Sequence, residues 1–208
     1  MTITITKVLM MVAFVSHMLI WYSDRLITYT PNGRFGFKYL NDNEKLSQLF
    51  KGTSLKRSTV SMLLGTFAMV PAFFGYLALC EWMRQFSTVY AVLMLIGTAV
   101  FFISVAPHHV LSGVIEWVYI KLGRTEEARK AITELFKKTS STMYVCYIGL
   151  LLFAASFFIA VVSGTTNLPQ WSCVFNILPL YLVLLPFRLV GTGNLASAIM
   201  FLGLFFII

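Results

Sequence analysis

The stretch TVYAVLMLIGTAVFFISVAPHHVLSGVIEWVYI, residues 88–120, decides which class of fold this chain can adopt. It contains no lysine or arginine and a single carboxylate, Glu116. A soluble core cannot absorb an apolar run of this length, whereas the hydrocarbon core of a bilayer accommodates about 20 apolar residues per helix. The stretch therefore predicts a helix that crosses a membrane.

The rest of the chain has the same character. Of its 208 residues 58% are hydrophobic and only 12% are charged, against roughly 25% charged residues in soluble domains. No polar linker separates two domains, so we expect one all-α integral membrane bundle over residues 1–208. About six transmembrane helices are predicted, over the apolar segments Val8–Tyr22, Thr59–Leu79, Thr88–Ile120, Met143–Val162, Trp171–Leu185 and Leu189–Ile208.

The third segment allows two structures because it is longer than a crossing helix needs and contains Pro107. Proline removes a backbone hydrogen bond and bends a helix. The segment is expected to form one long, tilted helix that is kinked at Pro107. The alternative is a break at Pro107 into a span and a separate re-entrant or interfacial piece.

The loop charges predict the orientation in the membrane. The first loop, about residues 23–57, carries seven lysines and arginines and the third carries six, whereas the second has only Arg84, the fourth has none and the fifth has Arg188. Because cytoplasmic loops are enriched in lysine and arginine, loops one, three and five are expected inside and both termini outside. The net charge of +8 then reflects topology and contact with anionic lipids, and we expect no nucleic acid partner.

Two elements are expected outside the spans. In the first loop, Pro31-Asn32-Gly33 predicts a turn and Asn43–Phe50 a short helix. Residues 125–138 predict an amphipathic helix, which we expect to lie on the membrane surface.

Five glycines within the spans predict close helix crossings: Gly65, Gly75, Gly97, Gly113 and Gly149.

All three histidines lie within apolar segments. Ionisable groups are costly in a bilayer, so each is a candidate functional residue. His17 precedes Asp24 by two helical turns, on the same face. His108 and His109 point about 100° apart on a helix, so both face one ligand only if the helix is broken there.

The same helix carries two further polar residues, Ser112 and Glu116, which form a polar stripe with the histidines. We predict that His108, His109 and Asp24 supply acid, base or charge. His17, Ser112 and Glu116 are predicted ligand-binding residues. The alternative is a network of hydrogen bonds that only holds the helices together.

We expect no metal and no cofactor. Three histidines and a carboxylate match the ligand types of zinc or iron, but the spacings H-x-x-x-H and H-E-x-x-H are absent. A P-loop, a dinucleotide fingerprint and a G-x-S-x-G elbow are also absent.

Three short patterns remain: Ser23-Asp24 leading to Tyr29, Pro107-His108-His109, and Pro169-Gln170-Trp171 followed by Asn176, Pro179 and Asn194. In these the chain resembles an uncharacterised family of small bacterial multi-pass membrane proteins. The resemblance implies no activity. It implies a bacterial inner-membrane protein in which Asp24, Tyr29, His109 and Asn176 form one site.

Three functions are consistent with these features. The leading hypothesis is an intramembrane cavity that binds a small lipophilic or lipid ligand, or an enzyme that modifies such a ligand, with membrane lipids as partners. The second is a small proton-coupled transporter that uses the same residues as a relay. The third is a non-catalytic membrane scaffold. A cavity open only to lipid favours the first, and a polar path to both faces favours the second.

Overall fold

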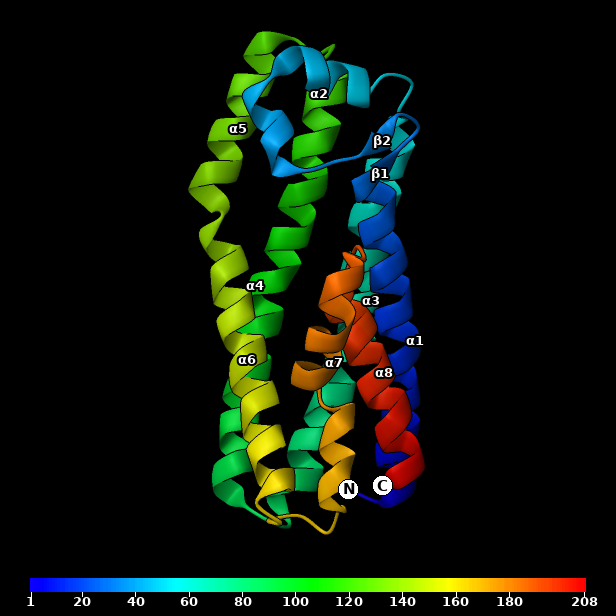
Figure 1. Cartoon of the computed structure of the whole chain (residues 1–208), viewed down its shortest axis with the longest axis vertical. Coiled ribbons are helices and arrows are strands. Elements are labelled where there is room, and N and C mark those ends of the chain that lie inside the picture. Colours follow the sequence, from blue (N-terminus) through cyan, green and yellow to red (C-terminus); the bar gives the residue numbers. More distant parts are fainter.

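The computed structural model describes residues 1–208, and nearly all of them lie in helices (Figure 1). The α-helices are α1 (Ile3–Thr28), α2 (Asn43–Leu49), α3 (Leu55–Arg84), α4 (Thr88–Lys121), α5 (Glu126–Thr139), α6 (Ser141–Val162), α7 (Ile177–Leu184) and α8 (Thr192–Ile207). Three short 3₁₀ helices are η1 (Phe37–Asn41), η2 (Gln170–Phe175) and η3 (Leu185–Phe187). The strands β1 (Tyr29–Thr30) and β2 (Gly33–Arg34) pair across the predicted turn, with Tyr29 opposite Arg34.

Four helical segments are long and apolar enough to cross a membrane: α1, α3, α4 and the nearly continuous pair α5–α6. Two shorter apolar segments follow, Ile177–Phe187 and Thr192–Ile207. The all-α class is therefore confirmed, together with membrane-spanning potential in four helices.

The fifth apolar segment is not one helix, contrary to expectation. Asn176 has an extended backbone, with φ −75° and ψ 150°, between η2 and α7. Its side chain accepts a hydrogen bond from the Leu178 N–H, so it caps the start of α7. Asparagine is a favoured N-cap residue because it satisfies such a free N–H, and the helix restarts here for that reason.

The third apolar segment is one helix. α4 runs unbroken from Thr88 to Lys121 with Pro107 inside it, so no separate piece follows Pro107. At about 1.5 Å per residue, its 34 residues extend well beyond a bilayer core of about 30 Å. The kink at Pro107 stays a prediction.

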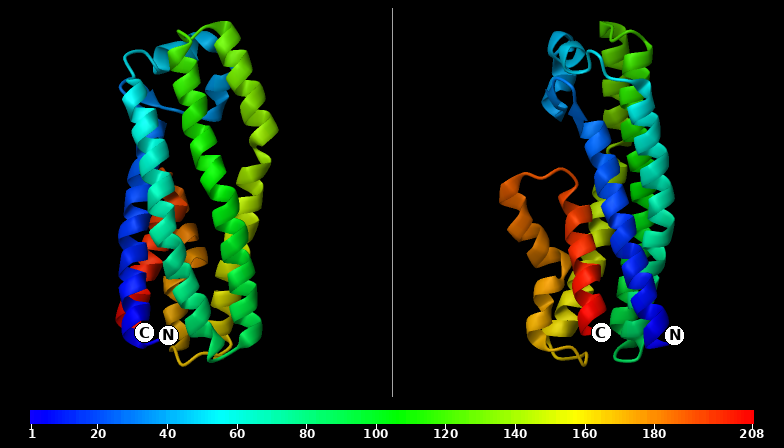
Figure 2. Two further views of the ribbon diagram at one scale, coloured as in Figure 1. Left: turned by 180° about the vertical axis from the view of Figure 1, so that it is seen from behind. Right: turned by 90° about the vertical axis from the view of Figure 1, so that its right-hand side faces the viewer.

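The helices form an open ring. α8 packs on α1, α1 on α3, α3 on α4 and α4 on α6, while α7 folds back against α8. The α7–α8 hairpin reaches only part of the height to which α3, α4 and α5 rise (Figures 1 and 2). Both termini lie at one end of the bundle, and α2 and α5 lie at the other (Figure 1).

The glycine crossings predicted at Gly75, Gly97 and Gly149 are confirmed, whereas Gly65 and Gly113 make room for side chains. A Cβ added at Gly97 would lie 2.6 Å from the Phe153 nitrogen, and one at Gly149 would lie 2.4 Å from the Phe101 nitrogen. Backbones of α4 and α6 therefore touch directly, which only glycine allows. Gly75 gives α3 the same closeness to α1.

The end of the bundle opposite the termini has a small core of its own. It is formed by η1, α2, α5 and the last turns of α4, from Leu40, Leu46, Phe50, Ile115, Tyr119, Ala128 and Ile132. The amphipathic helix expected at 125–138 is present as α5, but it continues α6 along the bundle axis (Figure 1). Its apolar face is covered by protein rather than by a membrane surface, because α4 and the first loop supply an apolar partner.

Candidate functional site

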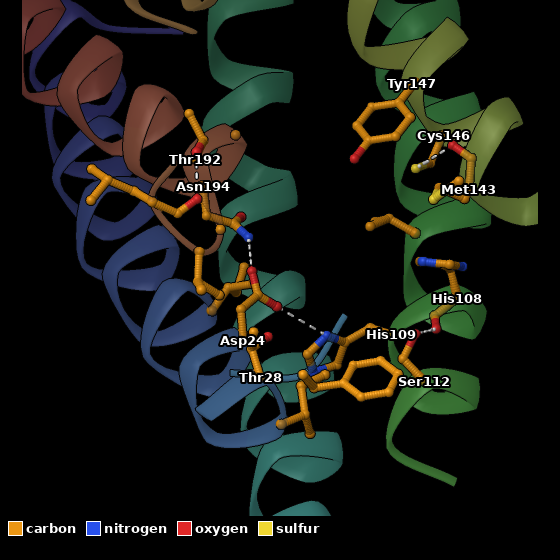
Figure 3. A pocket seen from close by; sticks show the side chains of 18 of the residues that line it. Asp24, Thr28, His108, His109, Ser112, Met143, Cys146, Tyr147, Thr192 and Asn194 are labelled. Carbon is orange, nitrogen blue, oxygen red and sulfur yellow. Dashed lines mark hydrogen bonds and ion pairs between the residues drawn. The ribbon is translucent and has the colours of Figure 1, made fainter. Parts of the chain in front are cut away.

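An open cavity of about 560 Å³ lies inside the ring of helices, within the usual size range of small-molecule sites. One wall is formed by α1 and α8 and the opposite wall by α4 and α6 (Figure 3). The tip of the α7–α8 hairpin and the first loop also contribute to it. Most lining residues are hydrophobic, and the ionisable ones include His17, Asp24, Arg34, His108, His109 and Glu116.

Asp24 is the centre of a hydrogen-bonded group that joins three helices. The Asn194 side-chain N–H donates to Asp24 Oδ2 at 2.8 Å, and His109 Nδ1 lies 3.5 Å from Asp24 Oδ1 (Figure 3). His17 Nδ1 lies 3.0 Å from Asn194 Oδ1 and donates to it, because an amide oxygen only accepts. The group thus connects α1, α4 and α8 at one wall of the cavity.

The hydrogen bond of His109 to Ser61 fixes which ring nitrogen carries a hydrogen. Its Nε2 lies 3.0 Å from the Ser61 carbonyl oxygen, which only accepts, so Nε2 carries a hydrogen. Its Nδ1 then lies 3.5 Å from Asp24 Oδ1. With one proton on either group, imidazolium with carboxylate and imidazole with carboxylic acid both give a neutral pair, whereas neutral His109 beside ionised Asp24 gives one negative charge.

Two glycines make room for this group. A Cβ added at Gly65 on α3 would lie 2.1 Å from His109 Nε2 and 2.7 Å from Ser23 Oγ. Gly191, just before α8, has φ +64°, and a Cβ there would lie 2.8 Å from Asp24 Oδ2. Side chains other than hydrogen would therefore push His109 and Asp24 out of their positions.

His108 stands on the opposite wall and has a different role. Its Nδ1 lies 3.1 Å from Thr142 Oγ1, and this hydroxyl donates to the Thr139 carbonyl oxygen at 2.7 Å. The hydroxyl hydrogen is thus engaged, so His108 Nδ1 must donate. Neutral His108 then has its lone pair on Nε2, which has no hydrogen-bond partner among the residues around the cavity (Figure 3).

His17 lies deeper and serves the Asp24 group. It is 1% exposed and packs against the rings of Tyr76 and Phe201, with centroid separations of 5.7 and 5.8 Å. Its Nε2 has no hydrogen-bond partner. The aromatic contacts hold the ring so that Nδ1 points at Asn194.

Glu116 and Ser112 line the same cavity but belong to separate hydrogen bonds. Ser58 donates to Glu116 Oε1 at 3.0 Å, and Glu116 is 5% exposed. Ser112 donates to the His108 carbonyl oxygen of its own helix at 2.9 Å. The predicted stripe on α4 is therefore present, with each member bonded to a different partner.

Two predicted residues are not part of this cavity. The Tyr29 carbonyl oxygen accepts a hydrogen bond from Arg57, and its ring lies 5.5 Å from the Arg25 guanidinium. Asn176 is 1% exposed, and its side-chain N–H donates to the Ala154 carbonyl oxygen at 2.9 Å. The structure therefore brings Asp24 and His109 together, as the resemblance implied, but places Tyr29 and Asn176 elsewhere.

Sequence reasoning named Asn194 only as part of a short pattern and missed it as a site residue. It also missed Arg34, Cys146 and Tyr147, which line the cavity. The only signal for Asn194 was a polar residue at the start of an apolar segment.

No cluster of three or more His, Cys, Asp or Glu residues is arranged to hold a metal ion.

Comparison with known proteins adds a family but no activity. The model of the family described as "Family of unknown function (DUF6796)" matches residues 1–208. No curated protein and no solved structure matches the chain.

Proposed function

The chain belongs to this family of unknown function, which brings no activity with it, and we propose from the cavity that the protein binds a lipophilic, lipid-like ligand taken from the membrane. The observation that carries the proposal is where the cavity opens. Three of its lining residues are exposed to the outside: Phe37 in the first loop (55% exposed), Tyr147 on α6 (54%) and Leu189 in the hairpin turn (39%). The opening therefore lies between α6 and the hairpin, below the first loop.

The surface beside this opening is apolar. Exposed hydrophobic side chains flank it on both sides, Ile148 and Leu151 on α6 and Leu182, Val183, Leu185 and Phe187 on the hairpin. Such a surface suits lipid chains rather than water. A ligand that enters here comes from the bilayer.

The interior is polar on one side and apolar on the other. Asp24, Asn194 and His109 form the polar part, with the free His108 Nε2 facing them. Phe101, Phe102, Val105 and Leu150 are among the apolar lining residues. Cavities of this kind bind molecules with an apolar body and one polar end, which the few polar groups orient.

We place six crossings in the membrane, with α7 and α8 as the last pair. Lys7 lies 5.7 Å from the Phe205 ring near one end of α8, and Asp24 lies at the other end of α8 beside Asn194. The 17 residue steps from Lys7 to Asp24 span about 25 Å of helix, close to a bilayer core of about 30 Å. The loop charges place both termini outside the cytoplasm, and the family resemblance places the protein in a bacterial inner membrane.

The packing below the cavity favours ligand binding over transport. Between the cavity and the termini, Tyr76, Phe153, Phe201 and Met200 are 0% exposed and fill the bundle. A carrier needs access from both faces, and this core closes one of them. Asp24 and His109 lie 3.5 Å apart, as members of a relay would, but the packing supports a pocket with one open side.

The test is native mass spectrometry of the purified protein after detergent exchange, with a variant that fills the cavity. Val105→Trp places an indole among the lining residues, whereas Val145→Trp places one on the exposed face of α6, since Val145 is 41% exposed and does not line the cavity. We expect wild type and Val145→Trp to retain a lipid and Val105→Trp to retain at least about tenfold less, because most cavity contacts are lost. Equal retention by all three proteins would refute the proposal.

A further inference from the structure

One arginine lines the cavity and a second adjoins it in the hairpin turn, and we infer that the pair binds the phosphate group of an anionic membrane lipid whose apolar part occupies the cavity. This inference rests on the proposed function and adds the class of ligand. Arg34 lies in β2 and lines the cavity, and Arg188 immediately precedes the lining residue Leu189 in the hairpin turn.

The two arginines adjoin each other although 154 residues separate them. Arg34 Nη1 donates to the Arg188 carbonyl oxygen at 2.6 Å. This bond uses one of the five N–H groups of the Arg34 guanidinium and none of those of Arg188. The first loop and the hairpin turn are thereby joined at the opening.

The remaining donors of both arginines are free. Both residues are exposed, and none of the ion pairs in the structure includes either of them. The neighbouring Arg57 differs, because it donates to the carbonyl oxygens of Leu26 and Tyr29. Arg25 also differs, because it stacks on Trp21 and Tyr29.

The backbone of the turn holds Arg188 at the rim. Arg188 has φ +51° and Gly191 has φ +64°, and a left-handed conformation is unfavourable for a residue with a side chain. The Arg34 bond to the Arg188 carbonyl oxygen helps to fix that conformation. The turn thus places the exposed residue Arg188 directly before the lining residues Leu189 and Val190.

The charge inside the cavity permits an anion at its rim. The Asp24–His109 pair adds no net charge when it holds one proton, and Glu116 is bonded to Ser58 on α3. Two guanidinium groups suit a phosphate, which offers several oxygens to their planar N–H groups. With the phosphate at Arg34 and Arg188, the acyl chain reaches the apolar lining through the opening beside Tyr147.

The experiment compares two lipids with the same acyl chains, phosphatidic acid and diacylglycerol, in titrations of detergent-solubilised protein followed by native mass spectrometry. For wild type we expect phosphatidic acid to bind at least about tenfold more tightly, the effect of about 1.4 kcal/mol expected from charge-assisted hydrogen bonds. Arg34→Gln and Arg188→Gln should each remove most of this preference and leave diacylglycerol binding unchanged. Arg188→Gln is the sharper variant, since the carbonyl oxygen that Arg34 binds is retained.

The control is Lys51→Gln, which removes one exposed charge from the same loop at a residue outside the cavity lining. It should bind both lipids as wild type does. The inference is overturned if the two lipids bind wild type equally, or if Lys51→Gln weakens phosphatidic acid as much as the arginine variants do. It is also overturned if submillimolar inorganic phosphate displaces the lipid, because the rim would then select a soluble phosphate. If neither lipid binds wild type, the proposed function itself fails.

Discussion

At the scale of single residues, Gly65 determines whether His109 can reach its partners. His109 is 6% exposed and contacts Ser61 on α3 and Asp24 on α1 from its position on α4. Its ring fits because α3 has no side chain at the point of contact. A buried polar group that loses its partners costs about 1–3 kcal/mol, so the glycine and the histidine depend on each other.

Gly65→Ala should therefore destabilise the protein. The added methyl would lie 2.1 Å from His109 Nε2, and overpacking of this kind costs about 1–3 kcal/mol. Thermal unfolding in detergent measures the effect. Gly193→Ala is the matched control, because a Cβ there meets nothing within 4 Å, and its stability should be unchanged or slightly raised. Equal melting temperatures for Gly65→Ala and wild type would show that His109 is not held as described.

At the scale of elements, the α7–α8 hairpin positions both the opening and the Asp24 group. α8 supplies Asn194, and the turn before it supplies Gly191 and Leu189. The hairpin is attached to α6 through Asn176, which donates to the Ala154 carbonyl oxygen and accepts from Leu178. Its base is further held by Gly203 against Phe175, where an added Cβ would lie 2.2 Å from the ring.

Asn176→Ala should loosen this attachment. It leaves the buried Leu178 N–H without its cap and removes the bond to α6, which together cost about 1–3 kcal/mol. Thermal unfolding should show the loss, and Asn176→Ser should recover part of it because serine can still cap α7. Asn41→Ala, at an exposed residue whose side chain makes no hydrogen bond, serves as control. A loss no larger than that of Asn41→Ala would contradict this role.

At the scale of the whole molecule, the cavity exists because helices distant in sequence face each other. α1 and α8 form one wall, α4 and α6 form the other, and the first loop and α5 extend the bundle beyond the hairpin (Figures 1 and 3). Basic residues are concentrated at that extended end. The cavity should accordingly open near the cytoplasmic leaflet.

Labelling of single cysteines in intact cells tests this orientation. In a Cys173→Ser background the remaining cysteines, Cys80 and Cys146, are buried. Asn167→Cys, in the exposed loop at the end that holds the termini, should react with a membrane-impermeant maleimide. Lys51→Cys, in the first loop, should react only after lysis. The reverse pattern would invert the orientation and place the cavity opening at the outer leaflet.

Much of the fold follows from local sequence. The apolar run from Thr88 to Ile120 predicts α4, and the turn at Pro31-Asn32-Gly33 and the helix at Asn43–Leu49 are also found. Glycine positions predicted the crossings of α4 with α6. These features depend on the hydrophobicity of each segment and on the backbone conformations open to each residue. Neither property depends on distant parts of the chain.

The site could be predicted only in part. Residue chemistry identified Asp24, His109 and His108, because ionisable groups are rare in apolar segments. It could not show that both nitrogens of His109 have partners while His108 keeps one free, since Ser61, Asp24 and Thr142 come from other helices. Tyr29 and Asn176 resembled site residues in sequence, yet backbone contacts place them outside.

The sequence by itself determined an all-α chain with helices apolar enough to span a membrane and ionisable residues inside them, because hydrophobicity and charge act locally on each segment. Only the tertiary structure decided that α7 and α8 form a hairpin, that α5 packs on protein, and that Arg34 meets Arg188 at an opening beside α6. The physical reason is that a cavity and its hydrogen bonds depend on which helix faces meet. That choice comes from packing between segments far apart in the chain.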